Sequence, residues 1–281
     1  MTSSWVHVTV TAASLLLGGP AAIAQDADIA HAFAAATPES RIVIDHAEWA
    51  ALLGRYLHAD PGGINRFAYG AVTPADHARL KTYIARLQTI SPRALNAHEQ
   101  HAFWINLYNA LTIEVVLDHY PVKSIRDISS GWFTFGPWDL PLATVAGRSL
   151  TLNNIEHDIL RKNWRDPRVH YALNCASLGC PNLAPLPYSG GSLDRELDTA
   201  AHAFVNHPRA VWLRNGRLVL SNIYNWYAKD FGDGSYAAVI AHIRHYADAT
   251  LAAQLTRQAT MSAYQYDWQL NAPGTQFEAL Q

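Results

Sequence analysis

The chain has 281 residues, 49% of them hydrophobic and 11% aromatic, with a formal net charge of −2 at pH 7. This length is enough for one large or two modest domains with a sizeable core, and nine tryptophans and thirteen tyrosines indicate an ordered globular protein. The low net charge and the lack of any basic run argue against nucleic-acid binding, which needs a concentrated positive patch.

The first 24 residues have the pattern of a secretory signal peptide. They are mostly apolar and small, and Ala-Ile-Ala at 22–24 precedes Gln25 in the form of a cleavage site. A transmembrane anchor is the alternative, but Gly-Gly-Pro at 18–20 interrupts the stretch. No later segment has about 18 consecutive apolar residues, so we expect an exported, periplasmic or extracellular protein without a membrane span in its mature chain. Residues 25–40 predict a loose N-terminal segment.

Apolar periodicity predicts helices over about 46–57, 74–90 and 99–118. The last of these is apolar nearly all round, which is typical of a helix buried in the middle of a domain. Asn106 and Asn109 share its remaining face. Because buried amides need hydrogen-bond partners, we expect a structural polar network there, with the orientation of a catalytic group as the alternative.

The second half of the chain predicts a mixture of strands and helices. A β region is expected over 131–152, with a hairpin around 146–148, and Asn215-Gly216 predicts a type I′ hairpin over 211–220. Further helices are expected over 153–164, 193–204, 222–229 and 235–257, and a closing strand over 264–270. Asn153 and Glu156 have the spacing of a capping box.

This order of elements predicts a single α+β domain over residues 41–273, predominantly helical with a small, mostly antiparallel sheet. Residues 274–281 form an expected C-terminal tail.

Residues 166–181 contain both cysteines of the chain, Cys175 and Cys180, together with His170. The alternation over 168–174 predicts a buried strand that runs into a loop of small residues. Cys175 would then lie at a strand end, where α/β proteins tend to place their chemistry.

Five motifs occur in order, namely FWINLYNALTI (103–113), LNNIEHDILR (152–161), DPRVHYALNCASLGCP (166–181), LSNIYNWYAKDF (220–231) and YDWQLN (266–271). Together they resemble the uncharacterised domain-of-unknown-function family 547. The resemblance implies a single domain and a papain- or transglutaminase-like relationship, but no settled activity. Plant-type members of that family keep the first cysteine while the second position varies, which implies a role for Cys175 beyond a disulfide.

Cys175 is the candidate nucleophile for acyl transfer or for hydrolysis of an amide or thioester. A free thiol is only a few per cent ionised at neutral pH and needs a base. We expect His157 to be that base, because it lies in the first turn of its predicted helix, where the helix dipole favours a neutral ring. His170 would lie about 16 Å from Cys175 on an extended strand. The alternative is a buried thiol and a core histidine without catalytic roles.

Other residues are expected to assist this pair. Asn109 would orient His157, with Asn106 or Asp267 as alternatives. Residues expected to contact a small-molecule or peptide substrate are Arg161, Arg168, His170 and Asn174, although each arginine could equally be an ion-pair partner. We expect no cofactor.

The competing hypothesis is a non-catalytic binding or scaffold domain with a structural or redox disulfide between Cys175 and Cys180. Four residues separate the two cysteines, one of them a glycine, and export would favour oxidation.

Metal and kinase chemistry are not expected. His98 and His101, like His242 and His245, have a spacing that can share a metal, and a zinc site of His157, His170 and Cys175 is a further alternative. The DFG letters at 230–232 lack the other kinase motifs.

Overall fold

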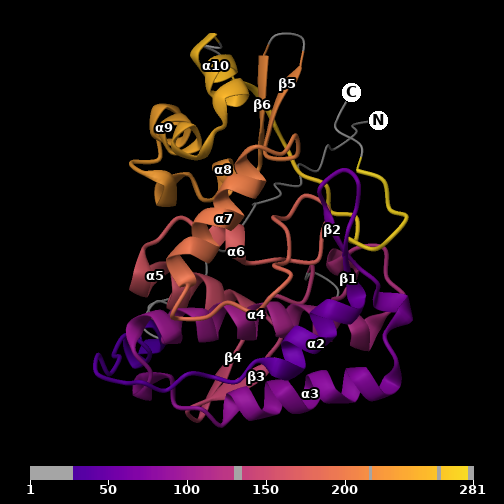
Figure 1. Ribbon diagram of the computed structural model, residues 1–281, viewed down its shortest axis with the longest axis vertical. Coiled ribbons are helices and arrows are strands. Elements are labelled where there is room, and N and C mark those ends of the chain that lie inside the picture. The colour runs from indigo at the N-terminus through magenta and orange to yellow at the C-terminus, as the bar shows by residue number, and fades with distance from the viewer. Residues whose placement is uncertain (1–27, 130–134, 215–216, 258–260, 278–281) are drawn as a thin grey trace, which may run out of the picture.

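The computed structural model describes residues 28–129, 135–214, 217–257 and 261–277 (Figure 1). The predicted signal peptide and the Asn215-Gly216 turn lie outside these residues. The fold is α+β, as expected: helices predominate, and the strands form small separate sheets. None of the helices in the described ranges combines the length and the apolarity that crossing a membrane requires.

Three helices form the lower layer in Figure 1, α2 (Ala47–Tyr56), α3 (Pro74–Gln88) and α4 (Ala97–His119). Each of the two longer helices starts at a side-chain cap: Thr73 accepts the N–H of Asp76, and Asn96 accepts the N–H of Glu99. Helix α4 is buried along almost its whole length, as its apolar sequence predicts. It is the central element of the larger of two hydrophobic clusters.

The upper layer contains α7 (Leu193–Val205), α8 (Ile223–Trp226), α9 (Tyr236–Tyr246), α10 (Ala249–Arg257) and the β5–β6 hairpin (Figure 1). Their apolar side chains form the second cluster, which includes Phe204, Leu220 and Ile243. Tyr171, from the segment with the cysteines, also belongs to this cluster, whereas its neighbour Ala172 belongs to the first. The cysteine segment therefore runs between the two clusters.

The sheets are short. β1 (Leu57–Ala59) pairs antiparallel with β2 (Asn65–Phe67), and β3 (Ala143–Val145) with β4 (Arg148–Leu150). β5 (Val211–Arg214) pairs antiparallel with β6 (Arg217–Ser221), and β6 pairs in parallel with β7 (Met261–Gln265). Both predicted hairpins are confirmed, since Val145 faces Arg148 and Arg214 faces Arg217 in the registers.

The prediction of a strand over 168–174 is wrong. Residues Val169–Ala172 form the short helix α6. Pro167 follows Asp166, whose carboxylate accepts the N–H of Arg168, and this turn leads directly into helical hydrogen bonds. Alternating side chains specify a strand only where a partner strand is available, and none pairs with this segment within the described residues.

The predicted helix over 153–164 has an unexpected form. Residues Asn154–Leu160 are a π-helix, η4, followed by α5 (Arg161–Trp164). The predicted capping box is also wrong, because the side chain of Asn153 accepts no capping hydrogen bond from a backbone N–H of the helix. Instead Thr151 and Asn154 exchange hydrogen bonds between side chain and backbone. The helix thus begins before residue 153, and His157 no longer lies in its first turn.

The chain termini of the described region also differ from expectation. Residues 28–32 are helical, and Ile29 and Phe33 are buried in the first cluster. The Phe33 ring contacts Trp104 edge-on, with 4.9 Å between the ring centroids. The closing strand ends at Gln265, so that Tyr266 and Trp268 are free to enter the candidate site.

Candidate functional site

A cavity of about 260 Å³ lies beside the disulfide loop and brings together residues from distant parts of the chain. Cys175, Cys180, His157 and His170 all line it. Its remaining walls are mainly aromatic and include Trp138, Trp226, Tyr227, Tyr266 and Trp268. Two of the predicted catalytic residues, Cys175 and His157, therefore share one cavity, and Asn109 does not line it.

Two buried amides shape the loop that carries Cys175. Asn109 donates from its side-chain nitrogen to the carbonyl of Ala172 at 2.9 Å and accepts the N–H of Asn174 at 2.9 Å. Asn174 in turn donates to the carbonyl of Pro181 at 2.7 Å and accepts the N–H of Ala176 at 2.9 Å. Ala176 has φ of +60°, a conformation that costs energy for any residue with a Cβ. These bonds hold the loop in that strained form, so Asn109 and Asn174 act on its shape.

Cys175 and Cys180 are joined by a disulfide, and no cysteine of the chain is free. Cys175 is half-buried and Cys180 is buried. The Tyr266 hydroxyl lies 3.0 Å from each sulfur atom. The backbone approaches closely here, because a Cβ on Gly179 would lie 2.8 Å from the backbone nitrogen of Asp267.

His157 points one ring nitrogen at an arginine. Its Nδ1 lies 3.2 Å from Nη1 of Arg161. A guanidinium only donates hydrogen bonds, so Nδ1 must accept, and a neutral ring then carries its proton on Nε2. In this arrangement His157 offers a donor rather than a free lone pair.

His170 has the opposite arrangement. Its Nε2 lies 2.7 Å from Oδ2 of Asp230, and the carboxylate can only accept, so the lone pair of the neutral ring is on Nδ1. No hydrogen bond to Nδ1 is found within the described residues. Burial lowers the pKa of His170, while the hydrogen bond to Asp230 opposes this shift. The Tyr227 ring stacks on the imidazole at a centroid distance of 4.0 Å.

Asp230 links the two histidines, and sequence reasoning assigned it no role in the site. Arg161 donates to both of its oxygens, at 2.5 and 3.0 Å, and the same arginine contacts His157. Burial alone would raise the pKa of Asp230, but the bonds from His170 and Arg161 outweigh it and hold that pKa well below its usual range. Its position in the motif LSNIYNWYAKDF was the available clue.

Glu156, which the sequence predicts as a capping residue, supplies the carboxylate of the cavity, with Oε1 3.8 Å from Nδ1 of His157. The side chain is buried, and the Tyr108 hydroxyl donates to it at 3.1 Å. Burial raises the pKa of Tyr108, and the negative charge of Glu156 raises it further.

Residues 92–205 match the family model described as protein of unknown function, DUF547. This match supports the family resemblance that the sequence motifs indicate. The match includes α4, η4, α6 and both cysteines, whereas Asp230 and Tyr266 follow it in the sequence. Neither a curated protein nor a solved structure matched the chain.

Arg168 lies outside the cavity. Its guanidinium pairs with Asp166, Asp194 and Asp198 at 2.6, 2.8 and 2.9 Å. These contacts connect α6 to α7. The ion-pair interpretation of Arg168 therefore has direct geometric support, and Arg161 is likewise paired with Asp230.

The histidine pairs noted in the sequence are engaged in other contacts. The His101 ring stacks on Trp164 at 4.7 Å, and His242 Nε2 lies 2.9 Å from the Tyr171 hydroxyl.

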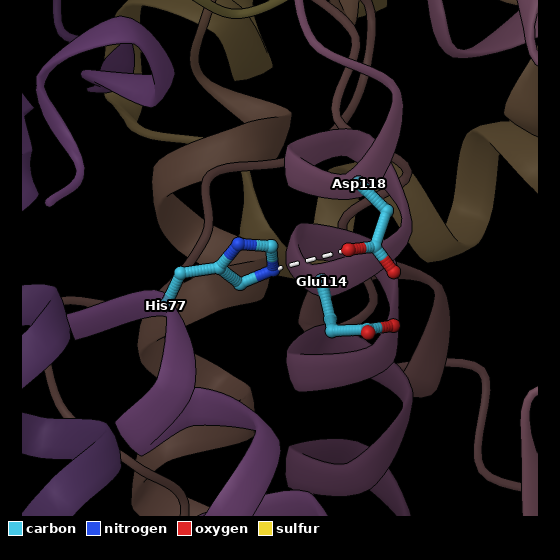
Figure 2. Close-up of side chains that lie close together, drawn as sticks. All are labelled: His77, Glu114 and Asp118. Atoms are coloured by element: carbon cyan, nitrogen blue, oxygen red, sulfur yellow. Dashed lines mark ion pairs between the residues drawn. The ribbon is translucent and has the colours of Figure 1, made fainter. Parts of the chain in front are cut away.

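Among the described residues, a separate cluster of possible metal ligands joins α3 and α4, namely His77, Glu114 and Asp118 (Figure 2). His77 Nε2 lies 3.4 Å from Oδ1 of Asp118. The Lys81 ammonium lies 2.7 Å from Asp118 and 3.6 Å from Glu114, so a positive charge already balances these carboxylates. We assign no metal to this cluster.

Proposed function

We propose that this chain binds a small-molecule or peptide substrate in the aromatic cavity and uses the Cys175 thiol for acyl transfer or for hydrolysis of an amide or thioester. The main support for this proposal is that the half-buried Cys175 lines the same cavity as His157 and His170. A papain- or transglutaminase-like relationship would accord with this chemistry.

The thiol must first be released from its disulfide. An external dithiol would supply two electrons and two protons, become a disulfide itself, and leave Cys175 and Cys180 as thiols. The bond between the cysteines would thus keep the site inactive until reduction. The Tyr266 hydroxyl, within 3.0 Å of both sulfurs, could then donate to the Cys175 thiolate.

His170 is the better-supported base in the described arrangement. Its lone pair is on Nδ1 and Asp230 holds the ring, whereas the lone pair of His157 Nδ1 is engaged by Arg161. In the proposed reaction His170 takes the thiol proton, and Cys175 Sγ attacks the carbonyl carbon. The leaving amine or thiol departs with that proton. Water then attacks the acyl group, its proton passes to His170, and the thiol is restored. In a transfer reaction an acceptor amine or hydroxyl replaces the water.

A second candidate is a non-catalytic binding or scaffold domain in which the disulfide is structural or redox-sensing. The bond itself and the contact of Tyr266 with both sulfurs favour this candidate. Both candidates include export, which the predicted signal peptide supports and with which a disulfide accords.

The first test is the thiol state of the natively produced protein, alkylated without reductant and analysed by mass. The second compares Cys180→Ser, which leaves Cys175 as the single thiol, with Cys175→Ser as the control. We expect Cys175 in the first variant to be alkylated at pH 7 at least about tenfold faster than a model thiol with a pKa near 8.5. Adding His170→Gln should remove most of that gain, and adding His157→Gln should not.

Reactivity no greater than that of the model thiol, or unchanged by His170→Gln, would reject the catalytic proposal in favour of the binding domain. Reactive protein would then be tested with thioesters and peptide amides for turnover.

A further inference from the structure

Among the described residues that line the cavity, the aspartate, glutamate, lysine and arginine side chains are represented by one carboxylate. Glu156 is the carboxylate in its wall, and no lysine or arginine lines it there. His157 Nδ1 lies 3.2 Å from the Arg161 guanidinium and 3.8 Å from Oε1 of Glu156. Burial lowers the pKa of His170 and so favours its neutral form. Among the described lining residues, the cavity therefore has a carboxylate and no lysine or arginine beside it.

The aromatic part of the cavity wall is a group of tilted rings. Tyr266 lies 4.8 Å from Trp226 and 4.6 Å from Trp268 between ring centroids, and Trp268 lies 5.7 Å from Trp138. The planes are inclined by 51–73° in these three pairs, so the rings form a curved wall rather than a stack. Trp226 is 45% exposed, a large apolar surface that internal packing does not use.

The faces of aromatic rings carry negative electrostatic potential and attract cations, with tryptophan the strongest of them. One ring of the cavity already makes such a contact from outside: the Arg161 guanidinium lies 4.9 Å from the centroid of Tyr227. Asp230 pairs with that arginine at 2.5 Å, so most of its positive charge is balanced by a carboxylate outside the cavity wall.

We propose that the cavity recognises an ammonium group of its ligand, with quaternary or N-methylated ammonium preferred. Such groups are weakly hydrated, so they give up little solvation on entering an aromatic enclosure, and the Glu156 carboxylate completes the charge balance. The inference names the substrate class of the proposed active site and rests on the same cavity, but it concerns binding and needs no reduced thiol.

The negative field extends over several groups around the cavity. Burial raises the pKa of Tyr227, and the charge of Glu156 raises it further. The same charge opposes the burial-induced fall in the pKa of His170. A bound cation would meet this field.

The test is a matched pair of ligands on the full-length oxidised protein. Choline carries a trimethylammonium group, and 3,3-dimethylbutan-1-ol has the same shape with carbon in place of nitrogen. Tryptophan fluorescence and calorimetry would measure both, with glucose as a neutral sugar probe. We expect choline to bind at least about tenfold more tightly than its neutral analogue, as a desolvated cation–π contact with a nearby carboxylate predicts.

Three variants locate the interaction. Glu156→Gln should weaken choline binding by about tenfold and leave the neutral analogue unchanged. Trp226→Leu, at a position that is 45% exposed, should weaken choline binding selectively because it keeps apolar contact but removes the aromatic face; circular dichroism checks that the variant is folded. The exposed Glu39→Gln is the charge control and should change neither.

Equal affinity for the two ligands, tighter binding of glucose, or no response to Trp226→Leu would overturn the inference. Because the measurement uses the oxidised protein, its failure is independent of whether Cys175 proves reactive after reduction.

Discussion

Asp230 is the position at which the structure makes its sharpest prediction. Its carboxylate accepts three hydrogen bonds, from Arg161 Nε and Nη2 and from His170 Nε2. Asp230→Asn keeps the size of the side chain but removes the charge. Arg161 would then be left as an uncompensated cation, and the ring of His170 would lose its anionic partner.

The magnitude follows from how exposed the pair is. Removing one partner of a fully buried ion pair costs about 3–5 kcal/mol, whereas exposed pairs contribute about 0–1 kcal/mol. The side chains of Arg161 and Asp230 are 26% and 25% exposed. We therefore expect Asp230→Asn to lower the free energy of unfolding by about 2 kcal/mol, which corresponds to about 4–8 °C in Tm for a chain of this size.

Urea denaturation followed by circular dichroism at pH 8 is the assay, since unfolded histidines are neutral there and the difference reports the lost carboxylate. Asp233→Asn is the matched control. Asp233 is exposed and accepts local hydrogen bonds, from Ser235 and from its own backbone, which asparagine can also accept, so its effect should stay within about 0.5 kcal/mol.

A second readout is the pKa of His170, measured by NMR. Burial lowers this pKa and the Asp230 bond raises it, so Asp230→Asn should lower it further. A destabilisation no larger than that of the control, or a His170 pKa that stays the same or rises, would refute the assigned role of Asp230.

Two further predictions concern pH and redox state. Burial and the hydrogen bond with Asp118 raise the pKa of Glu114 from 4.5 to about 7, so wild-type protein should lose stability as the pH rises between these values. Glutamine at position 114 cannot titrate, so the free energy of unfolding of Glu114→Gln should rise by about 1–3 kcal/mol relative to that of wild type between pH 4 and pH 8. A stability difference between the two proteins that is constant with pH would contradict this prediction. Reduction of the disulfide, which closes a loop with a sequence separation of 5, should lower the free energy of unfolding by about 2 kcal/mol. The Cys175→Ala/Cys180→Ala variant should have the same urea midpoint as reduced wild type, and reductant should not change it. Equal urea midpoints for wild type with and without reductant would contradict this prediction.

The sequence by itself determined the elements whose stability is local. Helix α4 follows from its continuous apolar surface and its Asn96 cap, and α3 from the Thr73-Pro74 start. The β3–β4 and β5–β6 hairpins follow from two-residue connections between alternating segments. In each case the deciding contacts lie within a few residues, so the pattern along the chain contains the necessary information.

The sequence also singled out residues that the structure brings together, because Cys175, His157 and His170 line the same cavity. It gave the wrong geometry for His170, since the strand over 168–174 is a helix. The distance of about 16 Å inferred for an extended chain therefore does not apply.

Only the tertiary structure decided which groups surround the cysteines. Asp230 meets His170 across a separation of 60 residues, and Tyr266 meets Cys175 across 91. Tyr108 meets Glu156 across 48. Such contacts depend on how the two hydrophobic clusters pack and on the path of the chain between them, and no local pattern encodes that path. The hydrogen-bond partners of each histidine, and the aromatic wall of the cavity that also contains Glu156, exist only once that packing is complete.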